Sequence, residues 1–141
     1  GPASPQDRVD DLLTSPLACS FHAVSVGQFH GLDYGPGAPS GSFAVVVAAS
    51  ADDLARRRAA IVERDGAAVA RMVRTGKQAL LIAVNPSGDT SALTLFAAAA
   101  RNGGVPAALS RQAMIGNTPL LVQSTGSCRA LPARRPADPA P

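Results

Sequence analysis

The stretch that decides the predicted fold reads SFAVVVAA from Ser42 to Ala49 and continues directly as SADDL from Ser50 to Leu54. The first part is a continuous apolar run, which is typical of a buried strand. The second part is typical of a helix start, because a serine can cap free backbone amides and acidic residues in the first turn favour the helix dipole. A strand followed at once by a helix predicts a mixed α and β domain.

The rest of the chain extends this prediction in both directions. The helix is expected to run from Ser50 to Gly66, with Leu54, Arg58 and Ile61 on one stripe, and Val69, Met72 and Val73 predict a second short helix at the i, i+3, i+4 spacing. The expected strands are residues 21–26, 42–49, 79–84, 91–100, 105–109 and 118–123, with a helical alternative open for the alanine tract of 91–100 and a loop at 31–41. The predicted fold class is α+β, with an antiparallel or mixed β-sheet of about five to six strands and one or two helices on one face.

Two cysteines, Cys19 and Cys128, enclose the predicted domain. Because both lie at its edges and neither lies in a strongly apolar run, we expect a Cys19–Cys128 disulfide that makes the first and last strands neighbours; the alternative is two free buried thiols. A disulfide favours an oxidising compartment, so we expect a periplasmic or secreted protein whose native signal peptide has been removed.

The predicted domain is residues 19–128, between a flexible leader at 1–18 and a Pro/Ala-rich disordered tail at 129–141. Gly1-Pro2 resembles the scar of a cleaved expression tag. The hydrophobic fraction is 46% but much of it is alanine, and aromatic residues make up only 4%, so each buried side chain contributes little area. No run approaches the ~20 apolar residues of a membrane span.

The chain has a formal net charge of +3, and its basic residues are concentrated between Arg56 and Lys77. An acidic partner protein or an anionic envelope surface suits this segment. Phosphate contacts with nucleic acid are an alternative, although no aromatic residues are interleaved for base stacking. A plain solvated helix face is the third interpretation. The candidate partner-binding residues are Arg56, Arg57, Arg58, Arg64, Arg71 and Arg74.

The histidines His22 and His30 are the chain's only imidazoles, and Asp33 lies close to the second in sequence. Together they are weak candidates for a metal site or for the base of a small hydrolase. Ordinary polar residues on a sheet surface are the simpler interpretation. No Gly-x-Ser-x-Gly motif and no phosphate loop is present, so we expect neither a catalytic residue nor a cofactor.

The order of segments resembles the PrcB-like domain, named for a polypeptide associated with a bacterial surface protease. The resemblance covers about residues 20–124 and rests on FHAVSVGQFHG from Phe21, AVVV from Ala44 with SADDL after it, LLIAV from Leu80 with PSG, and NTPLLV from Asn117. It implies a secreted or envelope-associated accessory domain that binds or stabilises a protein partner, with no catalytic residues. We therefore expect non-catalytic protein binding, with a small hydrolase or metal-binding protein using His22 and His30, or a basic nucleic-acid-binding module, as alternatives.

Overall fold

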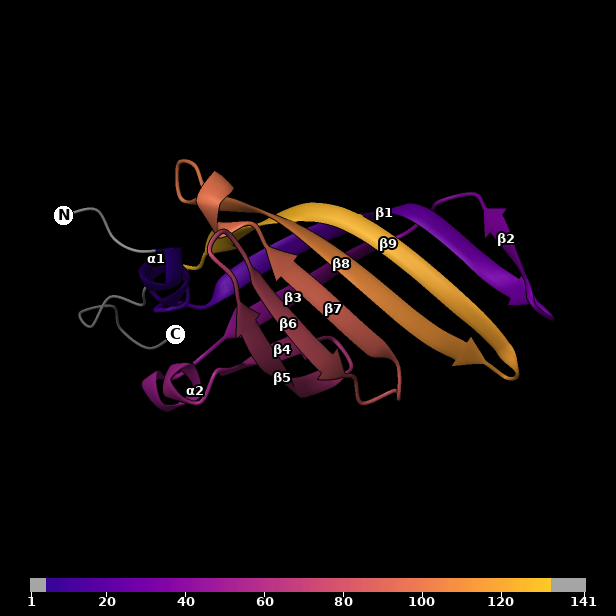
Figure 1. Ribbon diagram of the computed structural model, residues 1–141, viewed down its shortest axis with the longest axis horizontal. Helices are drawn as coiled ribbons and strands as arrows, with labels where there is room; N and C mark the ends of the chain where they lie inside the picture. Colours follow the sequence, from indigo (N-terminus) through magenta and orange to yellow (C-terminus); the bar gives the residue numbers. More distant parts are fainter. Residues whose placement is uncertain (1–4, 133–141) are drawn as a thin grey trace, which may run out of the picture.

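The computed structural model describes residues 5–132 and consists almost entirely of β-strands (Figure 1). The helices are α1 (Pro5–Leu12) and α2 (Ala51–Ala55), with a 3-10 turn η1 (Ala97–Ala99). The strands are β1 (Leu17–His30), β2 (Asp33–Gly37), β3 (Ser42–Ala48), β4 (Arg58–Glu63), β5 (Gly66–Arg74), β6 (Ala79–Val84), β7 (Thr90–Leu95), β8 (Gly104–Ile115) and β9 (Thr118–Ala130).

These strands form a closed antiparallel barrel. From β3 to β9 each strand pairs with the next one in the sequence, and β9 returns to pair with β1, which itself pairs with β3. The barrel therefore has eight strands, and β2 is a ninth strand on the far half of β1. The predicted α+β sheet of about five to six strands with helices on one face is wrong, because β1 and β9 close the sheet on itself.

The first error of the sequence prediction concerns the length of the helix that begins after Ser50. The start is as predicted: the Ser50 side chain accepts a hydrogen bond from the Asp53 amide, and the Asp53 carboxylate accepts one from the Ser50 amide. The helix ends at Ala55, however, because Arg57 adopts the left-handed conformation with φ of 53°. That conformation turns the chain directly into β4.

The second error concerns residues 67–74, which were expected to form a short helix. They form β5, in which Ala68, Ala70 and Met72 are buried while Val69 and Val73 are exposed. The burial therefore alternates with a period of two, as in a strand. Val69, Met72 and Val73 have helical spacing only because apolar residues lie on both faces of this strand. Residues 31–41, expected to be a loop, contain β2, and the strand expected at 91–100 ends at Leu95 before η1.

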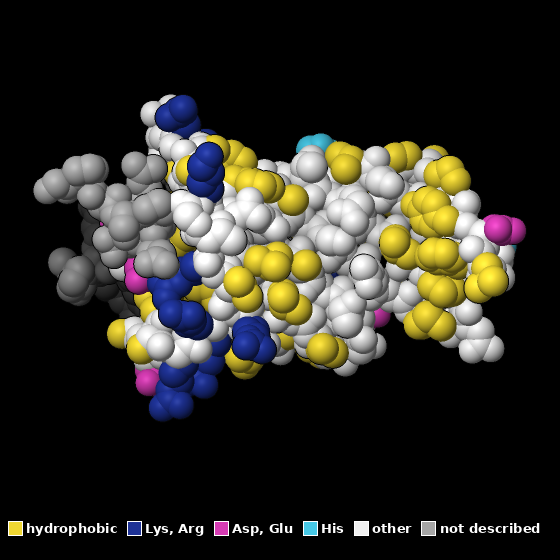
Figure 2. Space-filling model, viewed as in Figure 1, with side chains coloured by type: hydrophobic (Ala, Val, Ile, Leu, Met, Phe, Trp, Pro, Cys, Tyr) yellow, Lys and Arg dark blue, Asp and Glu magenta, His cyan; other side chains and the backbone are white. Residues whose placement is uncertain are grey.

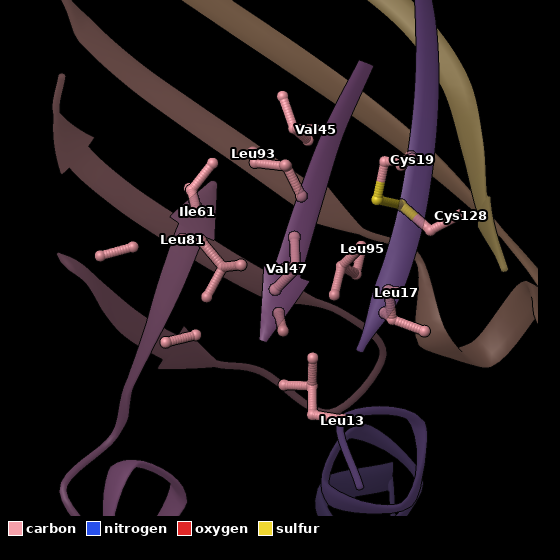
Figure 3. Packing of buried hydrophobic residues seen from close by; sticks show 14 of the residues in the cluster. Leu13, Leu17, Cys19, Val45, Val47, Ile61, Leu81, Leu93, Leu95 and Cys128 are labelled. Carbon is pink, nitrogen blue, oxygen red and sulfur yellow. A yellow bond between two sulfur atoms is a disulfide. The ribbon is translucent and has the colours of Figure 1, made fainter. Parts of the chain in front are cut away.

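The disulfide between Cys19 and Cys128 is confirmed and lies inside the barrel (Figure 3). The two residues are direct partners in the β1–β9 register, with 4.0 Å between their Cα atoms, and neither is more than 2% exposed. The first and last barrel strands are therefore neighbours, as the position of the cysteines predicts.

Side chains fill the barrel interior (Figure 3). The largest fully buried ones are Leu13, Leu17, Leu81, Leu93, Leu95, Val9, Val47, Val105 and the two cysteines. Val9 and Leu13 come from α1 and the turn after it, which cover one end of the barrel (Figure 1). The segment expected to be a flexible leader thus supplies α1 and the start of β1, and β9 continues to Ala130. The expected tag scar at Gly1-Pro2 and the tail from residue 133 onward lie outside the described residues.

Candidate protein-binding surface on the two-hairpin arm

Part of the sheet continues beyond the barrel. The β1–β3 ladder ends at His22–Ser42, and the β7–β8 ladder ends at Thr90–Gln112. Past these pairs only β1, β2, β8 and β9 remain, and they form a four-stranded projection that we call the arm, residues 24–37 and 113–123 (Figure 1). Because no second layer of strands covers the arm, its side chains meet solvent on both faces.

Large aliphatic residues are exposed at the two hairpin tips of the arm. Leu32 is 97% exposed in the β1–β2 turn, and Ile115 and Met114 are 65% and 60% exposed beside the β8–β9 turn. Both turns have two residues and begin with a glycine of positive φ, 63° at Gly31 and 60° at Gly116, as a type II′ hairpin requires. Each tip therefore presents at least one large apolar side chain to solvent at or beside a tight turn.

A groove of about 530 Å³ runs between the arm and the β6–β7 turn. Its apolar lining includes Phe29, Met114, Pro119 and Leu121. Among the described residues, Asp89 is the one charged side chain in the lining. Figure 2 shows apolar side chains gathered on the arm, whereas Lys and Arg side chains gather at the opposite end of the molecule.

An aromatic pair stiffens the outer half of the arm. The rings of Phe29 and Tyr34 meet edge to face, with 5.6 Å between their centroids. Tyr34 also lies over Gly27, where an added Cβ would stand only 2.2 Å from the tyrosine oxygen. The absence of a side chain at Gly27 lets the ring cover the strand, and Gly27 is buried as a result. This packing holds the Phe29 and Tyr34 rings against the outer half of the arm.

A polar cluster closes the barrel where the arm begins. Arg111 forms an ion pair with Glu63, and its guanidinium lies 5.4 Å from the centroid of the Phe43 ring. Nearby, the buried Asn85 side chain donates a hydrogen bond of 2.8 Å to Ser91. Since the Arg111 charge is already paired, it does not serve the arm as a free cation.

The six predicted arginines do not form one surface. Arg56, Arg57 and Arg58 follow α2, whereas Arg64 lies beyond the other end of β4, a strand of six residues and thus roughly 20 Å long. Arg71 is opposite Arg58 in the β4–β5 register. The structure brings four of the six near each other and separates Arg64 from them.

Acidic residues neutralise half of this set. Arg56 is 3.1 Å from Asp52, Arg58 is 2.8 Å from Asp53, and Arg74 is 2.5 Å from Asp10. The hydrogen bond from Arg58, followed by the one from the Ser50 amide, lowers the pKa of Asp53. The Arg58 and Arg74 pairs anchor α2 and α1 to the barrel, and the Arg56 pair lies within α2 and its C-cap, so three of the arginines have structural contacts of their own. Among residues 9–132, Arg57, Arg64 and Arg71 have no ion pair.

The two histidines are exposed and lie far apart on β1. Eight residues of extended strand separate them by roughly 26 Å. A β-bulge between Ala23 and Ser25 reverses the side-chain alternation, so His22 and His30 also point to opposite faces. His30 is opposite Asp33 in the register, as their proximity in sequence suggests. Within residues 9–132, no three His, Cys, Asp or Glu side chains are grouped to hold a metal ion.

No family model and no curated protein matches this chain. The resemblance to the PrcB-like domain therefore stays a prediction. None of the helices within residues 5–132 is both long and apolar enough to cross a membrane.

Sequence reasoning missed the residues of the arm, although one signal was present. Gly116-Asn117 is a hairpin dipeptide between apolar residues, with Met114 and Ile115 before it and Leu120 and Leu121 after it. The similar turn at Gly31-Leu32 lacks a second turn residue and was absorbed into the expected loop. A hairpin at Gly116-Asn117 would have extended β8 and β9 to their observed lengths.

Proposed function

We propose that this chain is a non-catalytic protein-binding module that contacts its partner through the arm. The observation that carries the proposal is the arm itself, a projection from a filled barrel with exposed Leu32, Met114 and Ile115 beside an apolar groove. Contiguous exposed apolar surface of this kind marks interaction sites in soluble proteins. An accessory role beside a larger secreted or envelope protein fits a surface that binds without catalytic groups.

The proposed location is the periplasm or the extracellular space. The Cys19–Cys128 bond is compatible with an oxidising compartment, where such bonds persist. Intact mass after alkylation under non-reducing conditions tests this directly on protein purified from its native source. Two alkylated thiols on that protein would contradict the proposed location.

Site-specific photo-cross-linking in the producing cells tests the binding role. A photoreactive amino acid at position 114 or 121 of the arm should give discrete adducts with a partner. The matched control is position 69 on the barrel wall, because Val69 is 73% exposed and Met114 is 60% exposed. Both sites are open to solvent, so exposure alone predicts equal labelling.

Adducts at positions 114 and 121 that are missing at position 69 would support the proposal. Equal labelling of all three positions, or no adduct at any of them, would rule out the arm as a specific binding surface. The histidine alternative has a separate test: substituting His22 and His30 by alanine leaves partner binding unchanged under our proposal, whereas a hydrolase or metal protein would lose its activity.

A further inference from the structure

One backbone edge of the arm is unpaired. Ile115 and Thr118 flank the two-residue β8–β9 turn, and such flanking residues exchange hydrogen bonds with each other. Because hydrogen-bonded and non-hydrogen-bonded pairs alternate along an antiparallel ladder, the N–H and C=O groups of Met114 point away from β9. On that side β7 has already ended, since its ladder with β8 stops at Thr90–Gln112.

The groove lies where β7 would continue if it were longer. Gln112, Ala113 and Met114 line it from β8, and Asp89 and Thr90 line it from the start of β7. A strand placed there would hydrogen-bond to Met114 and direct alternate side chains toward Phe29, Pro119 and Leu121. The groove thus combines a backbone edge with apolar contacts for side chains, as strand-addition sites do.

The opposite edge of the arm is protected. In β2 the groups that point away from β1 belong to Tyr34 and Pro36, because His30 and Asp33 flank the two-residue turn and the alternation starts from them. Pro36 has no N–H, and prolines on an outer strand are a known protection against edge pairing. Proline thus removes one outward N–H of β2 and leaves that of Tyr34, whereas the Met114 edge keeps its N–H and lies beside the apolar groove, which makes it the better site for an added strand.

We propose that an extended segment of a partner protein adds to β8 at Met114 as a short strand, with apolar side chains in the groove and a lysine or arginine facing Asp89. This inference rests on the proposed function and specifies its partner chemistry. The charge at Asp89 is the reason for the basic residue, since among the described residues it is the one charged group of the groove.

Charge also favours a foreign segment over a second copy of this chain. The arm holds no free basic side chain, because its nearest arginine, Arg111, is paired with Glu63. Two copies joined arm to arm would place no cation opposite Asp89. They would also bring the two Asp89 carboxylates into the same interface without compensation.

The experiment starts from a library of random ten-residue peptides displayed on phage and selected on the full chain. The best binder, synthesised with a fluorophore, is then measured by fluorescence anisotropy. We expect an extended apolar sequence with at least one lysine or arginine, and weaker binding to D89K than to D89N. M114P should weaken binding about tenfold or more because it removes the edge N–H, whereas M114L, which keeps the N–H, should stay within about threefold.

A measurement on the wild-type chain makes the test independent of folding of the proline variant. Exchange of the Met114 amide hydrogen with solvent should slow about tenfold or more when peptide is bound. Unchanged exchange at Met114, together with loss of binding in L121D but not in V69D, would overturn strand addition and leave the proposed function standing. Failure to select any arm-dependent peptide would also overturn strand addition, while the photo-cross-linking adducts still decide the proposed function. A concentration-dependent dimer that M114P dissociates would assign the edge to a second copy and overturn the foreign segment.

Discussion

Breaking the Cys19–Cys128 bond should destabilise the barrel by several kcal/mol. The bond joins residues that are 109 positions apart, so it closes a loop that contains almost the whole barrel. For a loop of this length the loop-entropy relation gives about 4.7 kcal/mol. Measured values are often lower, and we expect a loss of about 3–5 kcal/mol in the free energy of unfolding. This is a large part of the roughly 5–15 kcal/mol that is typical of a folded domain.

Urea unfolding followed by circular dichroism measures the effect, with oxidised and reduced wild-type chains compared side by side. The two samples have the same sequence, so their difference isolates the cross-link. With a typical slope of about 2 kcal/mol per M of urea, the midpoint should fall by roughly 2 M. The C19A/C128A double variant should be somewhat less stable than the reduced chain, because both sulfur atoms are buried and their removal leaves a cavity.

A difference below about 1 kcal/mol between the oxidised and reduced chains would refute this reasoning. It would mean that the β1–β9 ladder, which runs for most of the length of β1, holds the first and last strands together without the covalent bond. The slope of the urea transition separates the two cases. A changed slope would indicate that reduction alters the compactness of the unfolded chain rather than the folded barrel.

Three further predictions concern the packing and charges of the barrel. Gly126→Ala should lower the free energy of unfolding in urea by about 3 kcal/mol or more, because the added Cβ would stand 1.8 Å from a backbone oxygen of β1. The control is Gly76→Ala, where no atom lies within 4 Å of the added Cβ, and it should change the free energy of unfolding by less than about 1 kcal/mol. Glu63→Gln should lower the free energy of unfolding by about 1–3 kcal/mol because it leaves the Arg111 charge unpaired. In a double-mutant cycle, adding Arg111→Met should restore part of this loss, and additive effects of the two substitutions would contradict a coupled pair. Asp53 has a lowered pKa in the folded chain, so its contribution is complete above its ordinary value of 3.8 and is lost as the pH falls through the folded value. Asp53→Asn should therefore flatten the acid side of the stability profile, and an unchanged profile would exclude Asp53 as its source.

The sequence predicted most strands of the barrel because their apolar runs are local. The runs at 42–49 and 79–84 coincide with β3 and β6, and the cysteines predicted that β1 and β9 are neighbours. Closure was not predicted, because it depends on how many strands lie between these two neighbours. Each helix that was assigned in place of a strand removed one strand from that number and left an open sheet.

The misassigned strands share a physical cause, namely that barrel strands rich in alanine have weak period-two patterns. In β5 the inward residues are Ala68, Ala70 and Met72, while the outward residues include Val69 and Val73. The larger aliphatic side chains thus lie outside, where β-branched residues suit a strand, and the small ones lie inside. A prediction that places the most hydrophobic residues in the core therefore puts the wrong face of this strand inside, or assigns the segment to a helix.

The arm was not predicted because its large apolar residues are not buried, as such residues usually are in a folded domain. Met114, Ile115 and Leu32 are large and apolar yet exposed, so a search for buried faces finds nothing to align there. The arginines, which were the sequence's own candidate for a partner surface, turned out to be partly engaged in ion pairs that hold α1 and α2. The composition therefore indicated a charged partner surface, whereas the exposed surface of the arm is apolar.

The small, aromatic-poor core and the apolar arm are two consequences of one architecture. An eight-stranded barrel has an interior just wide enough for side chains, and here alanines, leucines and the disulfide fill it while α1 covers one end and the Arg111–Glu63 pair lies at the other. Buried side chains of the described residues thus occupy the barrel interior. The extra length of β1, β8 and β9 contributes little to this core, since the buried residues of β8 end at Leu109. The arm is therefore strand length that the core does not use, with exposed apolar residues at its tips, and this is the reason that our proposal assigns partner contact to the arm rather than to the barrel interior.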